Sequence, residues 1–230
     1  MKQGTLFVVA TPIGNLKDIT LRAIEVLSSV DSIVCEDTRV TNKILRRFDI
    51  KSNLISCNEF SEEKKISKIV DLLSCGLDVA LVSDAGTPCI SDPGFRLISY
   101  IRENKKDIDI VSIPGASALT ASISISGLPS DSLYFVGFLP KKKGRSKKLK
   151  YLASINSTLI IYESPFRVIK TLEDIYNIFG NRKLFIVREM TKMHESVYYG
   201  DLKHFLLQDE AVKNKGEFVL VVGKSGYKDE

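Results

Sequence analysis

Residues 79–94 read VALVSDAGTPCISDPG, and this stretch contains the pattern on which the fold depends. A short, continuous apolar run is followed at once by small residues, glycine and proline. A continuous apolar run is typical of a strand buried on both faces of a sheet, whereas glycine and proline are typical of tight turns. The stretch therefore predicts a buried strand that ends in a turn with little side-chain bulk.

Similar apolar runs recur along the whole chain, with helical patterns between them. Residues 66–73 and 168–179 place apolar side chains at helical spacing, and a glycine follows each pattern, at Gly76 and Gly180. The alternation of the two patterns predicts an α/β fold. The predicted strands are residues 5–10, 32–35, 54–56, 79–83, 108–113, 133–139, 158–162, 184–187 and 218–223.

Two dipeptides mark expected helix starts. Asp92-Pro93 and Ser164-Pro165 each combine a capping side chain with a proline, as the first turn of a helix often does. No internal repeat or low-complexity linker interrupts the chain. We expect two α/β domains, residues 1–116 and residues 117–230.

The composition is that of an ordinary globular protein. The chain has 230 residues, 44% hydrophobic and 27% charged, which excludes disordered, collagenous and coiled-coil classes. Its net charge of +5 comes from residues 141–150, KKKGRSKKLK, which contain no acid. The rest of the chain carries 26 of the 33 bases against all 28 acids, so a slightly acidic body carries one basic patch.

The cysteines, the histidines and the lengths of the apolar runs indicate the cellular location of the protein and whether it spans a membrane or holds a metal. Four cysteines without a CxxC pair, and a first segment without a secretory pattern, predict reduced thiols and a cytoplasmic protein. No apolar run approaches the roughly 20 residues needed to cross a bilayer. His194 and His204 lack the spacing of a zinc site, so neither a metal cofactor nor histidine base catalysis is expected.

Small and polar residues directly follow five of the predicted strands. In open α/β sheets, ligands bind at the carboxyl ends of the strands, where turns and helix N-termini present backbone N–H groups. The chain has neither GxxxxGK(S/T) nor GxGxxG, so we expect a nucleotide-like or similarly polar ligand, unless these are ordinary turns. Glu36 and Asp37 could meet ribose hydroxyls; the alternatives are that they are solvated or pair with a neighbour such as Arg39. The five clusters are residues 11–15, 84–88, 114–118, 163–165 and 188–192.

Seven motifs, in the same order over nearly the whole chain, resemble those of the ribosomal RNA small-subunit methyltransferases within the tetrapyrrole methylase superfamily. The resemblance implies 2'-O-methylation of a cytidine of the decoding centre in 16S ribosomal RNA or the small subunit. It also implies two α/β domains with S-adenosylmethionine in the cleft between them, and a homodimer. The motifs are LFVVATPIGNLKDITLRAIEVL (6–27), EDTR (36–39), LVSDAGTPCISDPG (81–94), PGASAL (114–119), YESPFR (162–167), REMTK (188–192) and GEFVLVVG (216–223).

The resemblance further implies which residues contact S-adenosylmethionine. Ala85, Gly86 and Thr87 stand where relatives that methylate porphyrin-like rings carry Gly-Gly-Asp. Asp84 is added because it follows a strand expected to line the site. The expected cofactor contacts are Pro12, Asp84, Ala85, Gly86, Thr87, Ile90, Ser117, Ala118, Glu163 and Met190.

Methyl transfer from a sulfonium to a ribose hydroxyl is an in-line displacement in which the hydroxyl also loses a proton. A carboxylate, or a lysine with a lowered pKa, could take that proton or stabilise the charge. The expected catalytic residues are Asp84, Glu189 and Lys192, which follow strands expected to line the cleft. For each of them, a structural ion pair or a cap is the alternative.

The basic patch fits contact with RNA phosphates, because lysine and arginine displace counterions from the RNA backbone. The expected RNA-binding residues are Lys141, Lys142, Lys143, Arg145, Lys147 and Lys148. A solvated helix or loop face is the alternative. Phe138 and Tyr151 flank the patch and are expected in the core.

Two other functions stay open. One is methylation of a small molecule or a protein, of the tetrapyrrole or diphthine type; Thr87 and the basic patch weigh against it. The other is RNA binding without catalysis, and the intact motifs at the strand ends weigh against that.

Overall fold

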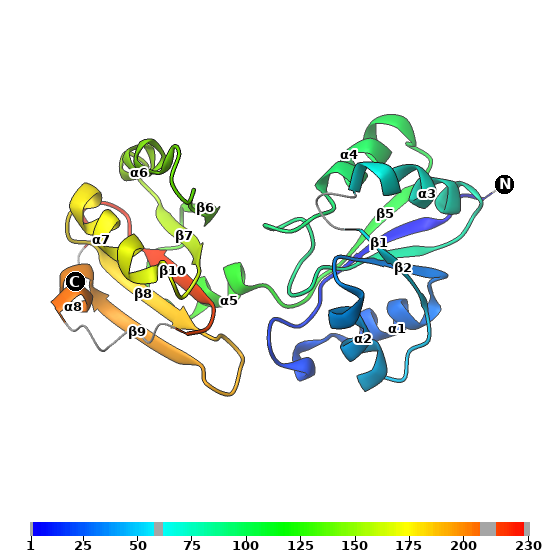
Figure 1. The fold of residues 1–230 in the computed structure, drawn as a ribbon, viewed down its shortest axis with the longest axis horizontal. Helices are drawn as coiled ribbons and strands as arrows, with labels where there is room; N and C mark the ends of the chain where they lie inside the picture. The colour runs from blue at the N-terminus through cyan, green and yellow to red at the C-terminus, as the bar shows by residue number, and fades with distance from the viewer. Residues whose placement is uncertain (1, 58–61, 208–214, 228–230) are drawn as a thin grey trace. The chain divides into compact units, whose positions relative to one another are not determined.

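The computed structural model describes residues 2–57, 62–207 and 215–227 (Figure 1). Contacts within the chain divide it into two compact units, residues 1–117 and 118–230. Each unit contains one five-stranded sheet, and helices pack on both of its faces. The expected independent domains, residues 1–116 and 117–230, stay a prediction.

The first unit is built on a parallel sheet with the strand order β3-β2-β4-β1-β5. All of its strand pairings are parallel, so every strand ends at the same edge. β2 and β4 are buried throughout, as continuous apolar runs predict. The strands are β1 (Thr5–Val9), β2 (Ser32–Cys35), β3 (Asn53–Ser56), β4 (Val79–Leu81) and β5 (Asp109–Ile113).

Helices cover both faces of this sheet, as the right-hand part of Figure 1 shows. α1 (Leu21–Ser29) and α2 (Thr38–Arg47) contribute to one apolar cluster with the sheet. α3 (Glu62–Ser74) and α4 (Phe95–Asn104) contribute to another on the opposite face. A short 3-10 helix, η1 (Leu16–Asp18), follows β1. Because helices occupy both faces, the carboxyl edge of the sheet is formed by loops.

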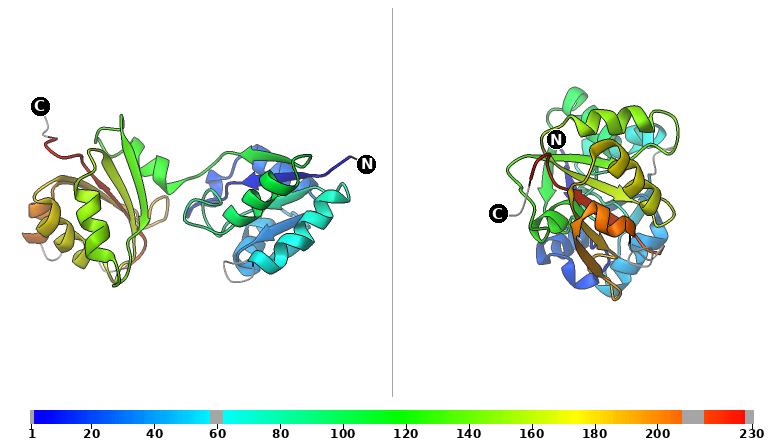
Figure 2. Two further views of the ribbon diagram at one scale, coloured as in Figure 1. Left: turned by 90° about the horizontal axis from the view of Figure 1, so that it is seen from above. Right: turned by 90° about the vertical axis from the view of Figure 1, so that its left-hand side faces the viewer.

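The second unit has a mixed sheet with the order β6-β7-β10-β8-β9, whose edges are β6 and β9. β6 and β7 run parallel, and the other pairings are antiparallel. Three helices pack on one face and α5 on the other (Figure 2). The elements are α5 (Ala118–Ser124), β6 (Leu133–Phe138), α6 (Arg145–Ala153), β7 (Thr158–Glu163), α7 (Val168–Phe179), β8 (Lys183–Arg188), β9 (Ser196–Asp201), α8 (Leu202–Leu207) and β10 (Phe218–Val222).

The predicted α/β fold is confirmed, and every predicted strand is present with bounds that differ by at most two residues. α3 and α7 end just before Gly76 and Gly180, as the helical patterns predict. The sequence prediction misses β9. Its residues alternate between half-buried and exposed, and its sequence SVYYGD contains no apolar run as long as that of the other edge strand, β6.

The helix start predicted at Asp92-Pro93 is wrong, because α4 begins at Phe95, after Gly94. Gly94 has a φ of 119°, and a Cβ there would lie 2.8 Å from Cδ2 of Leu81. Glycine therefore lets the chain turn into α4 at this point. Asp92 stays outside the helix, in the loop after β4.

The helix start predicted at Ser164-Pro165 is also wrong, because α7 begins at Val168. The carbonyl of Ser164 accepts hydrogen bonds from the N–H groups of Arg167 and Val168. These bonds close a turn ahead of the helix, and Ser164 does not cap it with its side chain.

Candidate active site

Three loops at the carboxyl edge of the first sheet are joined by hydrogen bonds. Thr11, after β1, and Gly86, after β4, exchange two backbone hydrogen bonds with N···O distances of 2.9 and 3.0 Å. The hydroxyl of Thr87 donates to the carbonyl of Ala116, after β5, at 3.2 Å. The loops therefore form one connected surface, which we call the cradle.

Glycines allow these loops to lie close together. Gly86 has a φ of 83°, and a Cβ there would lie 3.2 Å from Cγ2 of Ile13. A Cβ at Gly115 would lie 3.0 Å from the Cβ of Ala10. Both distances are shorter than ordinary van der Waals contact, so larger residues would force the loops apart.

The cradle contains most of the residues expected to contact S-adenosylmethionine. Ala85 is exposed, Ile90 is 38% exposed, and Ser117 is half-buried, whereas Pro12 is buried. Exposed small and apolar side chains beside glycine-lined backbone suit a nucleoside, which needs a flat apolar contact and a few polar groups. The cradle therefore fits the expected cofactor.

The other three residues expected to contact the cofactor belong to the second unit. Ala118 begins α5, and Met190 packs against the apolar cluster below that helix. Glu163 is 2% exposed. Its carboxylate accepts hydrogen bonds from the N–H of Ser164 and the hydroxyl of Thr171, at 2.8 and 2.7 Å. The side chain of Glu163 thus has partners within its own unit.

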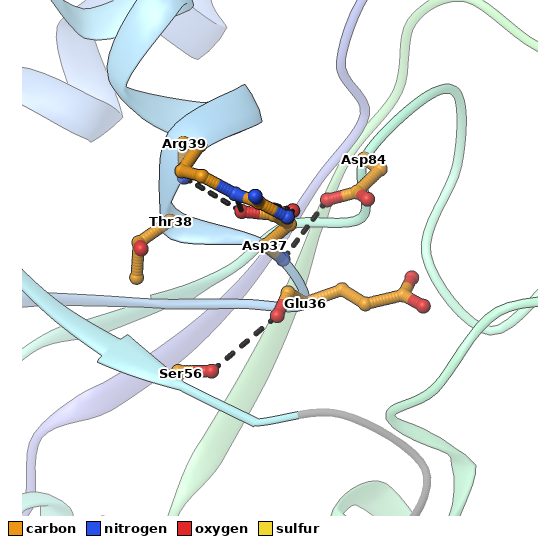
Figure 3. A pocket seen from close by; sticks show the side chains of 6 residues that line it. All are labelled: Glu36, Asp37, Thr38, Arg39, Ser56 and Asp84. Atoms are coloured by element: carbon orange, nitrogen blue, oxygen red, sulfur yellow. Dashed lines mark hydrogen bonds and ion pairs between the residues drawn. The ribbon is translucent and has the colours of Figure 1, made fainter.

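A pocket of about 370 Å³ opens at the carboxyl ends of β2, β3 and β4 (Figure 3). The N–H of Asp37 donates to Oδ1 of Asp84 at 3.0 Å, which joins the loops after β2 and β4. Arg39 forms an ion pair with Asp37 at 2.6 Å. Pairing with Arg39 was one of the alternatives left open by the sequence for Asp37, and it is present in the structure. We call this the acidic pocket; it is lined by Glu36, Asp37, Thr38, Arg39, Ser56 and Asp84.

Among the residues that the structure describes, Asp92 is an acid whose pKa is strongly raised by its surroundings. Burial, followed by the charges of Glu36 and Asp84, raises the pKa of its carboxyl group to about 7, against a hydrogen bond with Ser83 that lowers it. Burial also raises the pKa of Asp84, although the N–H of Asp37 opposes that shift. A carboxyl group that titrates near neutral pH is suited to accept a proton during a reaction.

Sequence reasoning missed Asp92 as a site residue because the proline after it suggested a helix cap. Its position in the same loop as Asp84 was the available signal. Ser56 was missed as well, because it ends a short strand without a motif.

Glu189 and Lys192, the other expected catalytic residues, form an ion pair with each other at 2.9 Å. Lys192 also contacts Glu217 at 2.8 Å. Burial lowers the pKa of Lys192, but the hydrogen bonds to Glu217 and Glu189 outweigh it, so the pKa lies above its usual value. Burial raises the pKa of Glu189, but the hydrogen bonds that its carboxylate accepts from Lys192 and from the N–H of Glu217 outweigh this effect. The pKa of Glu189 therefore lies below its usual value. The expectation of a lysine with a lowered pKa is therefore wrong for Lys192, and the ion pair given as the alternative is present.

The basic patch lies in the loop after β6 and on α6, and its members differ in exposure. Lys141, Lys142, Lys143 and Lys147 are exposed. Arg145 departs from the expectation, because its side chain is 12% exposed. Its guanidinium donates to Oδ2 of Asp174 and to the hydroxyl of Thr171, each at 2.8 Å. Arg145 thus holds α6 against α7 and does not present its charge to solvent.

The two aromatic residues beside the patch are not in the core. Phe138 is 58% exposed and Tyr151 is 54% exposed, so the expectation for both is wrong. Tyr151 lies on α6, whose inner face is formed by Leu149 and Leu152. The helix buries those leucines and leaves the tyrosine at the surface.

The cysteines, the grouping of possible metal ligands and the length of the helices bear on the remaining expectations. Cys35, Cys57, Cys75 and Cys89 are all free thiols. Within residues 2–57, 62–207 and 215–227, no group of three or more His, Cys, Asp or Glu side chains is placed to hold a metal ion. Over the same ranges, no helix combines the length and apolar character needed to span a membrane.

Comparison with known proteins gives one consistent result. A family model described as tetrapyrrole (corrin/porphyrin) methylases matches residues 5–206. Ribosomal RNA small subunit methyltransferase I of Thermotoga maritima is 45% identical over 95% of this chain and 98% of its own length. The protein of that name from Halalkalibacterium halodurans is 45% identical over 99% of this chain and 78% of its own length. The one from a Hydrogenobaculum species is 46% identical over 95% of both chains.

A solved structure shares the fold. Uroporphyrin-III C-methyltransferase from Thermus thermophilus superposes with a TM-score of 0.67 and 19% sequence identity. The match covers 96% of this chain and 95% of that one. At this identity the likeness supports the fold alone.

Proposed function

Because the chain belongs to the tetrapyrrole methylase family and, within it, to the ribosomal RNA small subunit methyltransferases I, we propose that it methylates the 2'-oxygen of a cytidine ribose in 16S ribosomal RNA, using S-adenosylmethionine. The nucleotide proposed is cytidine 1402 of the decoding centre. The similarity to ribosomal RNA methyltransferases over at least 95% of the chain is the observation that carries this proposal.

S-adenosylmethionine supplies a methyl group bonded to a positively charged sulfur. The proposed contacts in the first unit are Pro12, Asp84, Ala85, Gly86, Thr87, Ile90 and Ser117. Ala118, Glu163 and Met190 are proposed from the second unit by resemblance. Since the carboxylate of Glu163 already accepts two hydrogen bonds, a contact from this residue would use its backbone.

The acid groups beside the cradle are proposed to handle the proton. As the 2'-oxygen bonds to the methyl carbon and the carbon–sulfur bond breaks, the hydroxyl proton passes to the carboxylate of Asp92. Asp84 lies in the same loop, and its negative charge helps to raise the pKa of Asp92 into the range of a useful base. Glu189 and Lys192 are given no part in the chemistry, because each neutralises the other.

The exposed lysines are proposed to bind RNA phosphates. Lys141, Lys142, Lys143 and Lys147 are available at the surface, and Lys148 is half-buried. Arg145 is left out of this proposal because Asp174 already pairs with it. The salt dependence of RNA affinity should therefore come from the lysines.

A homodimer and a cytoplasmic location are further parts of the proposal, from the resemblance and the cysteine pattern. Sedimentation of the purified chain at twice its mass of 25.7 kDa supports the dimer. A monomer at assay concentration overturns it.

The deciding experiment supplies methyl-labelled S-adenosylmethionine with small ribosomal subunits, free 16S RNA or a tetrapyrrole precursor. Label on the ribose of one cytidine in RNA is expected. Label on an RNA base, on the tetrapyrrole or on a subunit protein overturns the proposal. Asp92→Asn in the same assay separates enzymatic label from background.

A further inference from the structure

The outer side of α6 combines exposed lysines with an exposed aromatic ring. Lys147 and Tyr151 are four residues apart and so neighbour each other on the helix. Lys150 is exposed as well, and Lys143 is exposed in the turn that leads into the helix. We call these four residues, Lys143, Lys147, Lys150 and Tyr151, the α6 surface.

Tyr151 is held in place by its neighbours. Its ring meets the ring of Tyr134, on β6, edge to face with centroids 6.4 Å apart. The ammonium group of Lys148 lies 5.4 Å from the Tyr134 centroid and 5.5 Å from the Tyr151 centroid. It also contacts the hydroxyl of Tyr134 at 3.4 Å. The Tyr151 ring thus contacts Tyr134 and Lys148 while 54% of the residue surface is exposed.

The chain segment that carries this ring has exposed charges of one sign. Residues 132–162, which contain β6, α6 and all of β7 except its last residue, Glu163, include no Asp or Glu, and the side chain of Glu163 is buried. Within this segment, Arg145 forms an ion pair with Asp174 of α7, which neutralises its charge. The lysines of the α6 surface therefore face solvent in a segment without acids of its own, which favours a polyanion as the partner.

We propose that the α6 surface binds an unpaired stretch of RNA, with a base stacked on Tyr151 and the adjacent phosphates on Lys143, Lys147 and Lys150. This rests on the proposed RNA substrate and adds to it the class of RNA: single-stranded at the point of contact. Bases in a duplex are stacked on each other and cannot meet a protein ring, whereas splayed bases stack on exposed aromatic side chains. Lys148 is a positioning residue, because its contacts are with the two rings.

Tyr199 provides a matched control within the second unit. It is 46% exposed and has the ammonium group of Lys183 at 5.8 Å from its ring centroid, which is close to the arrangement at Tyr151. It differs in charge, since Lys183 also pairs with Asp201 at 3.7 Å. If any exposed tyrosine beside a lysine binds RNA, the two should behave alike.

Binding is measured with the full chain, a twelve-nucleotide unpaired RNA and the same strand in a duplex. Tyr151→Leu is expected to weaken binding of the unpaired RNA about ten-fold and to leave duplex binding unchanged, because a stacked base is lost but no charge is. Tyr151→Phe should keep the affinity, and Tyr199→Leu should keep it too. Equal losses for unpaired and duplex RNA, or no loss, overturn the proposal.

A second measurement uses the absence of tryptophan from the chain. Tyr151→Trp introduces a single indole, whose fluorescence should be quenched by unpaired RNA and not by duplex. If an acidic protein of the small subunit quenches it and RNA does not, the partner is a protein and the proposal is wrong. Methyl transfer to subunits by the wild-type chain is scored separately, so failure of the function is distinguishable from failure of this surface.

Discussion

Replacing Asp92 with asparagine tests the proposed base, because the change removes the titrating carboxyl group while keeping its shape. General bases contribute about 100- to 10,000-fold to rate, so kcat of Asp92→Asn should fall by at least about 100-fold. In the wild-type chain, kcat should rise with pH through a midpoint near 7, the pKa of Asp92. The variant should lack this rise.

The same substitution should stabilise the fold at neutral and higher pH. The pKa of Asp92 rises from an ordinary 3.8 to about 7 on folding, so the folded state holds a proton that the unfolded state releases. Its contribution to stability is present in full below pH 4 and is lost as pH rises to 7. The loss is on the order of 4 kcal/mol at most, from 1.36 kcal/mol per pKa unit. Asparagine has no proton to lose over this range, so Asp92→Asn should not show this loss of stability.

The assays are methyl transfer to small ribosomal subunits between pH 5 and 9, and thermal unfolding over the same range. Asp107→Asn, an exposed acid in the turn before β5, is the matched control and should change neither. A variant that keeps its rate would exclude Asp92 as the base. A variant that melts earlier than wild type at pH 8 would refute the electrostatic argument.

Three further predictions concern the other groups. Lys192→Met should lower the free energy of unfolding by about 1–3 kcal/mol, because the half-buried carboxylate of Glu189 loses its lysine partner. The kcat of the folded protein should stay within a few-fold of wild type. If denaturant melts show no loss of stability but the rate falls, Lys192 has a catalytic role. Gly86→Ala should weaken S-adenosylmethionine binding in calorimetry by about ten-fold, since its φ of 83° strains alanine and its Cβ would lie 3.2 Å from Ile13. Unchanged affinity would contradict the proposed contact between Gly86 and the cofactor. Replacing Lys141, Lys142 and Lys143 with glutamine should flatten the salt dependence of RNA binding, whereas Arg145→Gln should lower the melting temperature and leave that slope unchanged; equal slopes for the two variants would contradict the division between exposed and paired bases.

The first sheet could be predicted from the sequence because its signals are local. A strand buried on both faces needs a continuous apolar run, and each such run is visible within a few residues. The turn at residues 84–88 shows its glycine and proline in the same way. β9 could not be found by this rule, since its residues alternate between half-buried and exposed and its sequence has no such run.

The partners of side chains could not be predicted, because they come from distant parts of the chain. Arg145 meets Asp174, and Lys192 meets Glu217, across 29 and 25 positions. Nothing in KKKGRSKKLK distinguishes Arg145 from the lysines beside it. The register of α6, which turns Leu149 inward, also turns Tyr151 outward, and this depends on packing against the second sheet.

The pairing within the acidic pocket explains how neighbouring acids acquire different roles. Arg39 donates hydrogen bonds from its side chain and from its backbone N–H to the carboxylate of Asp37, and these bonds hold the pKa of Asp37 at about 2. Asp37 therefore stays ionised, and its charge contributes to the raised pKa of Asp84. Burial raises the pKa of Asp92, and the charges of Glu36 and Asp84 raise it further. If Arg39 faced Asp92 instead, the pKa of Asp92 would fall and it could not accept a proton strongly at neutral pH. Arg39→Met removes a positive charge that lowers the pKa of Asp84, whereas Asp37, with an ordinary pKa of 3.8, stays ionised near pH 7. The midpoint of the kcat profile should therefore stay in place or move to higher pH, and a move to lower pH would contradict this account.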